Sequence, residues 1–226
     1  MHGSIGIGHT RWATHGAPNE CNAHPHHDCS NSIAVVHNGI IENATALRRQ
    51  LESRGHRFES ETDTEVLAHL IEAASEDGEP LQDAVMDALR IIDGTYGIAV
   101  ISSRDPHKVV CARKGSPLLL GLGDGEYFVA SDVAAILEHT RQVVYLDDGE
   151  MGVLTASGYE VLDLSARRVR KGVSRIDWDL DQIEKGGFDH FMLKEIFEQP
   201  QTIQNTMRGR LVADEGFSKL GGLNLT

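Results

Sequence analysis

The densest group of chemically useful side chains lies at residues 8–16, which read Gly-His-Thr-Arg-Trp-Ala-Thr-His-Gly. The segment includes the end of a Gly-Ile alternation at residues 4–9 that predicts a strand, and loops at strand ends are frequent binding sites. Arg11 offers a planar fork of donors that matches a carboxylate. Without further context, an arginine and a tryptophan stacked on a domain surface explain these residues equally well.

A second candidate, Asn38-Gly39, comes just after an apolar run at residues 33–36 that is typical of a strand buried on both faces. The side-chain amide of Asn38 and the N–H of Gly39 are donors suited to an oxyanion that develops during acyl transfer. The alternative is an Asn-Gly turn, which is the more common meaning of this dipeptide.

Asp63 is the third candidate, because residues 62–65 (Thr-Asp-Thr-Glu) form a capping-box pattern. The pattern predicts Thr62 as the N-cap of a helix and Asp63 in its first turn, where the helix dipole favours an ionised carboxylate. A carboxylate that serves only the helix end is the alternative. Sharing one pocket, Arg11 and Asp63 would match the carboxylate and the ammonium of an α-amino acid.

A histidine-rich stretch offers side chains of the type that bind zinc. The candidate ligands are Cys21, His24, His26, His27 and Cys29. Pro25 interrupts the stretch, and no second ligand pair follows at a standard spacing. The pattern therefore favours a histidine-rich loop without a metal.

Alternating helices and short strands must position these residues. Amphipathic patterns predict helices at residues 44–54, at 62–74 and from Pro80 onward. Short Val-, Ile- and Leu-rich segments separated by Gly, Asp and Ser then predict strands at 97–102, 109–113, 118–121, 127–130, 142–146, 150–155 and 159–164. A short helix is expected at 132–138. The series indicates an α+β fold with largely antiparallel sheets.

The C-terminal part has a different character. Residues 189–207 predict a helix broken at Pro200, because proline lacks the N–H that a helix interior needs. Residues 216–226 are polar and glycine-rich, as in a linker that leads to another domain.

Composition limits the classes of partner. Lys and Arg total 21 against 34 Asp and Glu, which gives a net charge of −13. Such a surface repels nucleic acid and anionic membranes, so neither is expected as a partner. No apolar run approaches the roughly 20 residues that span a bilayer, and no secretory signal is evident. Three cysteines, an odd and low number, fit a reducing compartment, so a cytoplasmic location is expected.

Five segments together resemble a known family. Residues 8–16, 22–26, 37–43 and 60–65 occur in the order found in the glutaminase domain of the class II glutamine amidotransferases. Residues 190–200 (His-Phe-Met-Leu-Lys-Glu-Ile-Phe-Glu-Gln-Pro) resemble one branch of that family, the glutamine–fructose-6-phosphate transaminases (isomerising), or glucosamine-6-phosphate synthases. This resemblance implies a four-layer αββα sandwich of the N-terminal-nucleophile type.

The resemblance also implies roles in binding L-glutamine. Arg11 and Asp63 hold its α-carboxylate and α-amino group, Thr14 and His15 line the pocket, Trp12 gates the released ammonia, and Asn38 and Gly39 form the oxyanion hole. His24 lies in a matching motif, but no role is assigned to it. The family implies neither a metal nor an organic cofactor.

The family's nucleophile is a cysteine at the first position, whose own α-amine acts as the base. This chain begins with Met1-His2, and an internal cysteine has no free α-amine. We therefore expect residues 1–186 to be a glutaminase domain without its first strands and helix, inactive by itself. Residues 187–226 are expected to end that domain and lead toward a sugar-isomerase domain that binds fructose 6-phosphate. The intact enzyme, a homodimer, would make glucosamine 6-phosphate for amino-sugar biosynthesis.

Two alternatives stay open. The chain also fits another class II amidotransferase, such as the phosphoribosyl-diphosphate enzyme, or a non-catalytic module that binds glutamine. The strings Arg-Trp-Ala-Thr-His and Lys-Glu-Ile-Phe-Glu-Gln-Pro favour the sugar-phosphate branch over the former.

Overall fold

The computed structural model describes residues 3–11, 16–75, 79–177, 187–207, 211–212 and 217–218. The chain divides into two compact units, Met1–Asp177 and Trp178–Thr226, which are described separately. The predicted domain boundary at residue 186 falls outside the described residues and stays a prediction.

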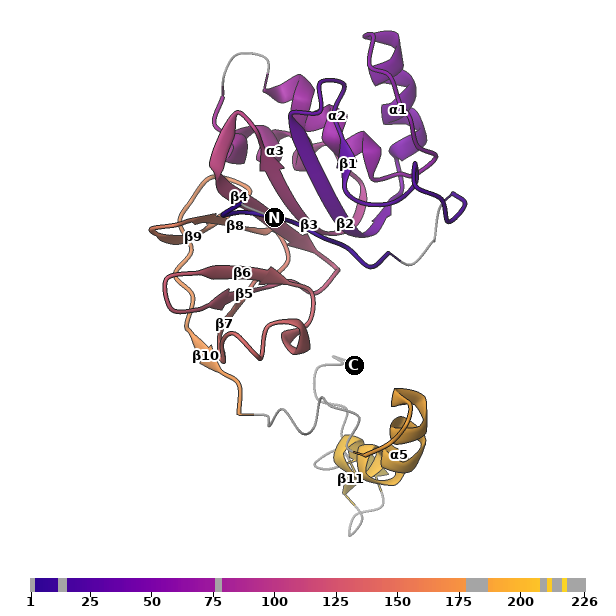
Figure 1. The fold of residues 1–226 in the computed structure, drawn as a ribbon, viewed down its shortest axis with the longest axis vertical. Coiled ribbons are helices and arrows are strands. Elements are labelled where there is room, and N and C mark those ends of the chain that lie inside the picture. The colour runs from indigo at the N-terminus through magenta and orange to yellow at the C-terminus, as the bar shows by residue number, and fades with distance from the viewer. Residues whose placement is uncertain are drawn as a thin grey trace. The chain divides into compact units, whose positions relative to one another are not determined.

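A six-stranded antiparallel sheet organises the first unit (Figure 1). Its strand order is β1-β2-β3-β4-β8-β9. The strands are β1 (His26–His27), β2 (Ile33–Ile41), β3 (Gly94–Ser102), β4 (Asp105–Lys114), β8 (Glu150–Thr155) and β9 (Gly158–Asp163). Hairpin connections between neighbouring β-rich segments explain the antiparallel pairing of β3 with β4 and of β8 with β9.

Three helices cover one face of this sheet (Figure 1). They are α1 (Ala44–Ser53), α2 (Glu65–Ala74) and α3 (Leu81–Arg90), close to the ranges that their apolar periodicity predicts. Their buried faces pack with residues such as Val35, Ile98 and Val110 into a single hydrophobic core.

A second antiparallel sheet faces the opposite side of the first (Figure 1). Its order is β10-β7-β5-β6, with β10 (Ser174–Arg175), β7 (Gln142–Tyr145), β5 (Leu119–Leu122) and β6 (Tyr127–Ala130). Val36 and Cys111 of the first sheet pack with Leu120 and Val144 of the second in a separate core. Neighbours such as Val35 and Val36 thus belong to different cores, because successive strand residues point to opposite faces.

A short segment over residues 132–140 lies against the second sheet. It contains the 3-10 helix η1 (Val133–Ala135), and a Cβ added at Gly121 would lie 2.6 Å from Ile136 Cδ1. The described layers are thus helices, a six-stranded sheet and a four-stranded sheet. The predicted α+β sandwich with antiparallel sheets is confirmed.

The predicted strand at residues 4–9 is wrong. In its described residues, the segment pairs with no strand, although Ile7 packs against the core between the two sheets. The Gly-Ile alternation places Ile5 and Ile7 on the same side of an extended segment, where both are partly buried. This burial does not require backbone hydrogen bonds to a neighbouring strand.

The second unit contains α5 (Phe191–Met207), with Pro200 inside it, and the two-residue strands β11 (Leu211–Val212) and β12 (Phe217–Ser218). The predicted break at Pro200 is absent, since a helix can continue past one missing N–H. Most of the predicted linker at 216–226 lies outside the described residues. None of the helices searched is both long and apolar enough to cross a membrane.

Replacing Ile71 with alanine tests the core between α2 and the sheet. Ile71 is fully buried, so Ile71→Ala should lower the free energy of unfolding by about 2–5 kcal/mol through lost burial and a cavity. Ile91→Ala is the matched control, because Ile91 is 51% exposed and its loss should cost no more than about 0.5 kcal/mol. Urea denaturation measures both, and equal losses would contradict the described packing.

Candidate functional site

A cavity of about 360 Å³ brings together four of the predicted site residues, Arg11, Asn38, Gly39 and Asp63. They come from three segments: the chain after residue 8, the end of β2 and the loop before α2. The other residues that line it are His9, Thr10, His24, His37, Thr62 and Thr64. Three further predicted residues, Trp12, Thr14 and His15, lie outside the described residues.

Arg11 adopts a backbone conformation that is uncommon for a side-chain-bearing residue, with φ of 47°. Its N–H donates to His9 Nδ1 at 2.9 Å, and its guanidinium donates to Ala17 O at 3.3 Å and Gly16 O at 3.4 Å. These contacts restrain the side chain of Arg11, which is one of the residues that line the cavity. Strained backbone of this kind is concentrated at functional sites.

The buried side chain of Asn22 connects the chain at Ala17 to the loop that carries Asp63. Asn22 donates to Ala17 O at 3.0 Å and accepts from the N–H of Glu61 at 2.8 Å. Gly16 has φ of 72°, and a Cβ there would lie 2.6 Å from Asn22 Nδ2, so only glycine allows this approach. Asn22 therefore holds Arg11 and Asp63 on one cavity.

A chain of hydrogen bonds orients the Asn38 amide. Because the Arg11 N–H donates to His9 Nδ1, the proton of a neutral His9 ring sits on Nε2. His9 Nε2 then donates to Asn38 Oδ1 at 2.6 Å. Because Asn38 Oδ1 accepts this hydrogen bond, the NH₂ group of the same amide is the part of the side chain that can donate to a ligand.

Asn38 and Gly39 lie inside β2, where they pair with Gly97 and Tyr96 of β3. The alternative of an Asn-Gly turn is therefore wrong. Gly39 has φ of 136°, and a Cβ there would lie 2.2 Å from Thr95 O. Glycine is required because the two strands approach too closely for a side chain.

The capping-box prediction is wrong. Helix α2 begins at Glu65, and its N-cap Thr64 makes no side-chain capping bond. The hydroxyls are used elsewhere: Thr62 contacts His26 Nε2 at 3.0 Å, and Thr64 contacts His37 Nδ1 at 3.0 Å. Asp63 consequently lies before the helix, where its carboxylate accepts from the N–H of Ile41 at 2.8 Å.

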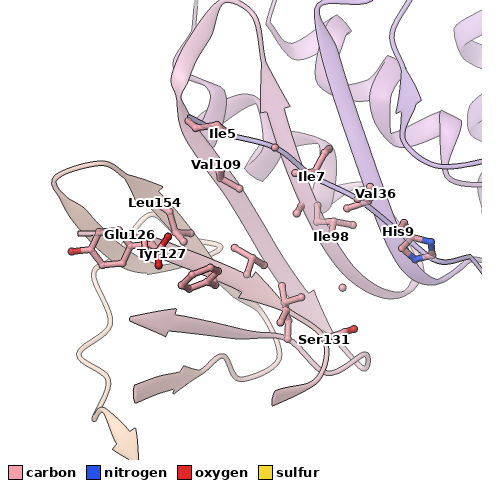
Figure 2. Close-up of a pocket in the computed structure, with 18 of the residues that line it drawn as sticks. Ile5, Ile7, His9, Val36, Ile98, Val109, Glu126, Tyr127, Ser131 and Leu154 are labelled. Atoms are coloured by element: carbon pink, nitrogen blue, oxygen red, sulfur yellow. The ribbon is translucent and has the colours of Figure 1, made fainter. Parts of the chain in front are cut away.

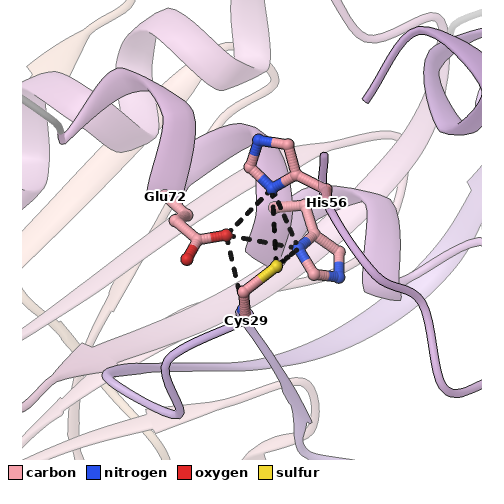
Figure 3. Close-up of side chains that lie close together, drawn as sticks. Cys29, His56 and Glu72 are labelled. Carbon is pink, nitrogen blue, oxygen red and sulfur yellow. Dashed lines mark hydrogen bonds and ion pairs between the residues drawn. The ribbon is translucent and has the colours of Figure 1, made fainter. Parts of the chain in front are cut away.

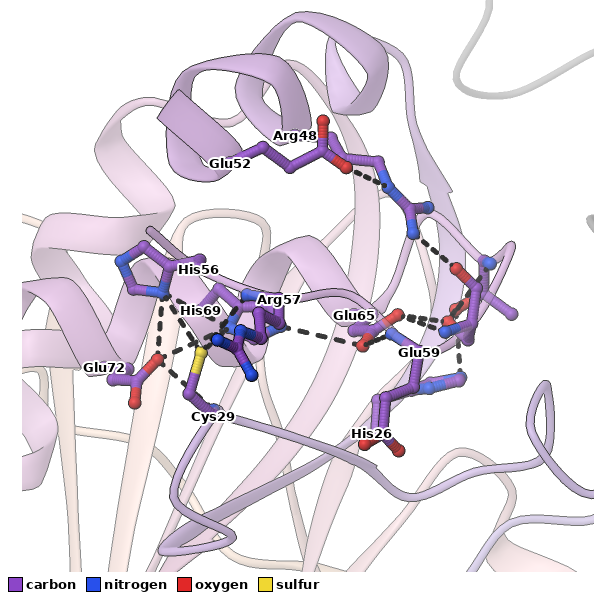
Figure 4. A network of polar contacts seen from close by, with 12 residues as sticks. His26, Cys29, Arg48, Glu52, His56, Arg57, Glu59, Glu65, His69 and Glu72 are labelled. Atoms are coloured by element: carbon purple, nitrogen blue, oxygen red, sulfur yellow. Dashed lines mark hydrogen bonds and ion pairs between the residues drawn. The ribbon is translucent and has the colours of Figure 1, made fainter. Parts of the chain in front are cut away.

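Glu65 instead turns its carboxylate back to the chain ahead of α2 (Figure 4). It accepts from the N–H groups of Glu59 and Ser60, each at 2.7 Å. Burial acts to raise the pKa of Glu65, but His69 and the donors at Ser60 and Glu59 together lower it to about 2. The buried carboxylate therefore stays ionised and braces the loop that carries Asp63.

Three histidines that received no role from the sequence also line the cavity: His9, His24 and His37. His24 stacks on His9 with ring centroids 4.2 Å apart and accepts from the N–H of His37 at 3.2 Å. Burial, followed by the neighbouring His9 and His26, lowers the pKa of His24 to about 3. Burial likewise lowers the pKa of His37. Both rings are neutral at physiological pH.

A larger cavity of about 570 Å³ opens between the two sheets (Figure 2). Apolar side chains such as Ile5, Ile7 and Val36 line it, and His9 and Asn38 line it too. It therefore adjoins the smaller, more polar cavity. Sequence patterns did not indicate it, because it depends on how far apart the sheets stand.

A family model described as a glutamine amidotransferase domain matches residues 9–138. The chain is 55% identical over 223 residues to a glutamine–fructose-6-phosphate aminotransferase (isomerizing) of Chlorobaculum tepidum, covering 98% of this chain and 36% of that protein. A protein of the same name from Methanothermobacter thermautotrophicus is 57% identical over 205 residues, which are 91% of this chain and 35% of that protein. The chain thus spans about a third of the length of these relatives.

Among solved structures, a glutamine phosphoribosylpyrophosphate amidotransferase from B. subtilis matches with a TM-score of 0.57 and 30% identity. The match covers 72% of this chain and 35% of that chain. It supports the predicted fold type, the sandwich of the class II amidotransferases.

The neutral histidines predict a loss of stability in mild acid. The pKa of His24 is lowered from 6.5 to about 3 and that of His26 to about 4, chiefly by burial. Below about pH 6.5 the unfolded chain binds protons that the folded chain does not, so the unfolding free energy should fall from there toward pH 4. The slope is at most about 1.4 kcal/mol per pH unit for each ring, reduced by solvent screening at the partly exposed His24.

Urea denaturation at several pH values measures this slope. His24→Gln should reduce the slope, because glutamine keeps an acceptor for the His37 N–H but does not titrate, while the contribution of His26 remains. His27→Gln is the control, since His27 is exposed. A slope unchanged by His24→Gln would contradict the neutral assignment.

Proposed function

The chain belongs to the glutamine amidotransferase domain family, and we propose that the cavity around Arg11 and Asp63 is the L-glutamine site of a glutamine–fructose-6-phosphate aminotransferase (isomerising). The observation that carries this proposal is the convergence of a guanidinium, a carboxylate and the Asn38-Gly39 pair on one cavity of about 360 Å³. Glutamine carries the complementary groups: a carboxylate, an ammonium and an amide.

In this proposal, Arg11 binds the α-carboxylate of glutamine through its planar fork, and Asp63 binds the α-ammonium. The half-buried carboxylate of Asp63 is held by the N–H of Ile41, and Arg11 by the carbonyls of Gly16 and Ala17. Both groups are thus positioned before the ligand arrives, which lowers the entropic cost of binding.

Asn38 and Gly39 form the oxyanion hole of the proposed reaction. Donors aimed at developing charge are effective when they are already oriented. His9 supplies that orientation, because it engages Asn38 Oδ1 at 2.6 Å and leaves the NH₂ group to donate. Trp12, Thr14 and His15 keep the roles that the family resemblance implies, as an ammonia gate and as pocket-lining residues.

We propose that this chain alone binds glutamine without hydrolysing it. Cys21 and Cys29 are exposed, Cys111 is buried, and none of them lines the cavity. Burial raises the pKa of Cys111 to about 12, which keeps it as an unreactive thiol. None of the three has the free α-amine that the family's nucleophile uses.

The acceptor of the ammonia is proposed to be fructose 6-phosphate, bound by a sugar-isomerase domain of the intact, homodimeric enzyme in the cytoplasm. Identities of 55% and 57% to proteins named for that substrate support this choice. The phosphoribosylpyrophosphate enzyme is the second candidate, but its identity is 30%.

Isothermal titration calorimetry with L-glutamine, paired with a glutaminase assay, tests the binding proposal on this chain. Arg11→Ala should raise the dissociation constant by about 10- to 150-fold, since a charge-assisted pair contributes about 1.5–3 kcal/mol. Arg49→Ala on the exposed face of α1 is the control and should leave the affinity unchanged. Equal affinity of the wild type and Arg11→Ala would remove Arg11 from its role, and measurable turnover would contradict the proposed inactivity.

Asn38→Ala tests the oxyanion hole in a fusion with an N-terminal segment that supplies the family's nucleophilic cysteine. We expect kcat to fall by about 10²- to 10³-fold with little change in KM, because the donor acts mainly on the transition state. Asn31→Gly is the control, since Asn31 is exposed and has φ of 55°, which glycine accepts. Steady-state kinetics measure both, and a loss confined to KM would count against the assignment.

A further inference from the structure

Four side chains away from the glutamine cavity bring metal-ligating atoms together (Figure 3). The Sγ of Cys29, the Nδ1 atoms of His56 and His69 and a carboxylate oxygen of Glu72 all lie within 4.8 Å of one another. We propose that these residues form a structural Zn²⁺ site. None of the four lines the glutamine cavity, so this proposal stands independently of the proposed function.

The distances among the nitrogen and sulfur ligand atoms are close to those of a tetrahedral zinc site. Zn–N bonds of about 2.0–2.1 Å and a Zn–S bond of about 2.3 Å place nitrogens about 3.3 Å apart and sulfur about 3.6 Å from nitrogen. The two Nδ1 atoms are 3.3 Å apart, and Cys29 Sγ lies 3.6 Å from His69 Nδ1 and 3.8 Å from His56 Nδ1. Glu72 Oε2 lies 2.9 Å and 3.3 Å from the same two nitrogens.

His56 Nδ1 shows how closely the ligand atoms are gathered. His56 Nδ1 has three polar neighbours, the Nδ1 of His69, the Sγ of Cys29 and the Oε2 of Glu72, but it carries at most one hydrogen. A cation at the centre would accept the lone pairs of both imidazoles together with the thiolate and the carboxylate. A set of ligands that contains a thiolate sulfur and two imidazole nitrogens favours zinc over magnesium or calcium, which prefer oxygen ligands.

Two groups outside the four proposed ligands, the carboxylate of Glu65 and the backbone N–H of Arg57, contact the ligands His69 and Cys29 (Figure 4). The carboxylate of Glu65 lies 3.6 Å from His69 Nε2, on the side of the ring away from the cluster. A carboxylate behind a metal-binding histidine orients the ring and keeps the proton off the ligating nitrogen. The N–H of Arg57 donates to Cys29 Sγ at 3.4 Å, a contact that a metal-bound sulfur also accepts.

The scaffold holds the ligands from three segments. His69 and Glu72 lie one turn apart on α2, His56 follows α1, and Cys29 lies between β1 and β2. The carboxylate of Asp28 accepts from the N–H groups of Ser32 and Ile33, which fixes the loop that carries Cys29. A site with four protein ligands has no open position, so its role is structural.

This proposal departs from the sequence expectation of no metal, and it groups Cys29 with different partners. His24 stacks on His9 and His26 contacts Thr62, so neither turns toward Cys29. The ligands that replace them, His56, His69 and Glu72, are distant in sequence, which is why spacing did not reveal them.

Cobalt binding to the chelator-treated 226-residue chain tests the site. We expect one tightly bound Co²⁺ per chain, with the visible bands of tetrahedral cobalt and a thiolate-to-cobalt charge-transfer band, and displacement of both by Zn²⁺. Cys29→Ser should abolish the charge-transfer band and weaken zinc binding at least about 10-fold. Cys21→Ser is the matched control, because Cys21 is also exposed and lies outside the cluster.

Glu72→Gln provides a second variant that preserves size on the partly exposed side of the site. It should keep the charge-transfer band but raise the zinc dissociation constant, while circular dichroism confirms that the variant is folded. The proposal is overturned if the wild type binds no stoichiometric metal, if Cys29→Ser keeps the charge-transfer band, or if Cys21→Ser loses it.

Discussion

Strand β2 is buried on both faces, and the positions of the cavity residues depend on this constraint. Its pairing with β3 is continuous from Ile33 to Ile41, so the register of the buried valines also sets the register of Asn38 and Gly39. Helices pack on one face and the second sheet on the other, which leaves β2 no freedom to slip by one residue without exposing a core. At its end, the N–H of Ile41 binds Asp63 and joins the strand to the loop before α2.

The polar groups around this strand are satisfied mostly by one another. His9, His24 and His37 each use a ring nitrogen to accept or donate, and each bond restricts the tautomer of the ring. Burial lowers the pKa of His24 and of His37, so these rings act as neutral hydrogen-bonding groups. Such a network specifies one arrangement, because a displaced member would leave a buried partner without its bond.

Helix α2 connects the proposed glutamine cavity with the proposed zinc site. The residues just before it, around Asp63, line the proposed glutamine cavity, and its next two turns carry His69 and Glu72 of the proposed zinc site. Glu65 contacts both regions, since it accepts from Ser60 ahead of the helix and faces His69 behind it. Zinc would therefore brace the helix whose start positions Asp63.

The sequence by itself determined the three helices of the first unit, the order of strands after residue 94, the α+β class and the family, because each depends on local periodicity or on contiguous motifs. It did not determine that Asn38 and Gly39 lie within a strand, since an Asn-Gly pair commonly turns and only the contact with Thr95 O requires the glycine there. It also misassigned the start of α2, because the hydroxyls of Thr62 and Thr64 bind histidines that are distant in sequence. The grouping of Cys29 with His56, His69 and Glu72 was decided by tertiary structure alone, because packing α2 against the loop after β1 brings together ligands that no spacing connects.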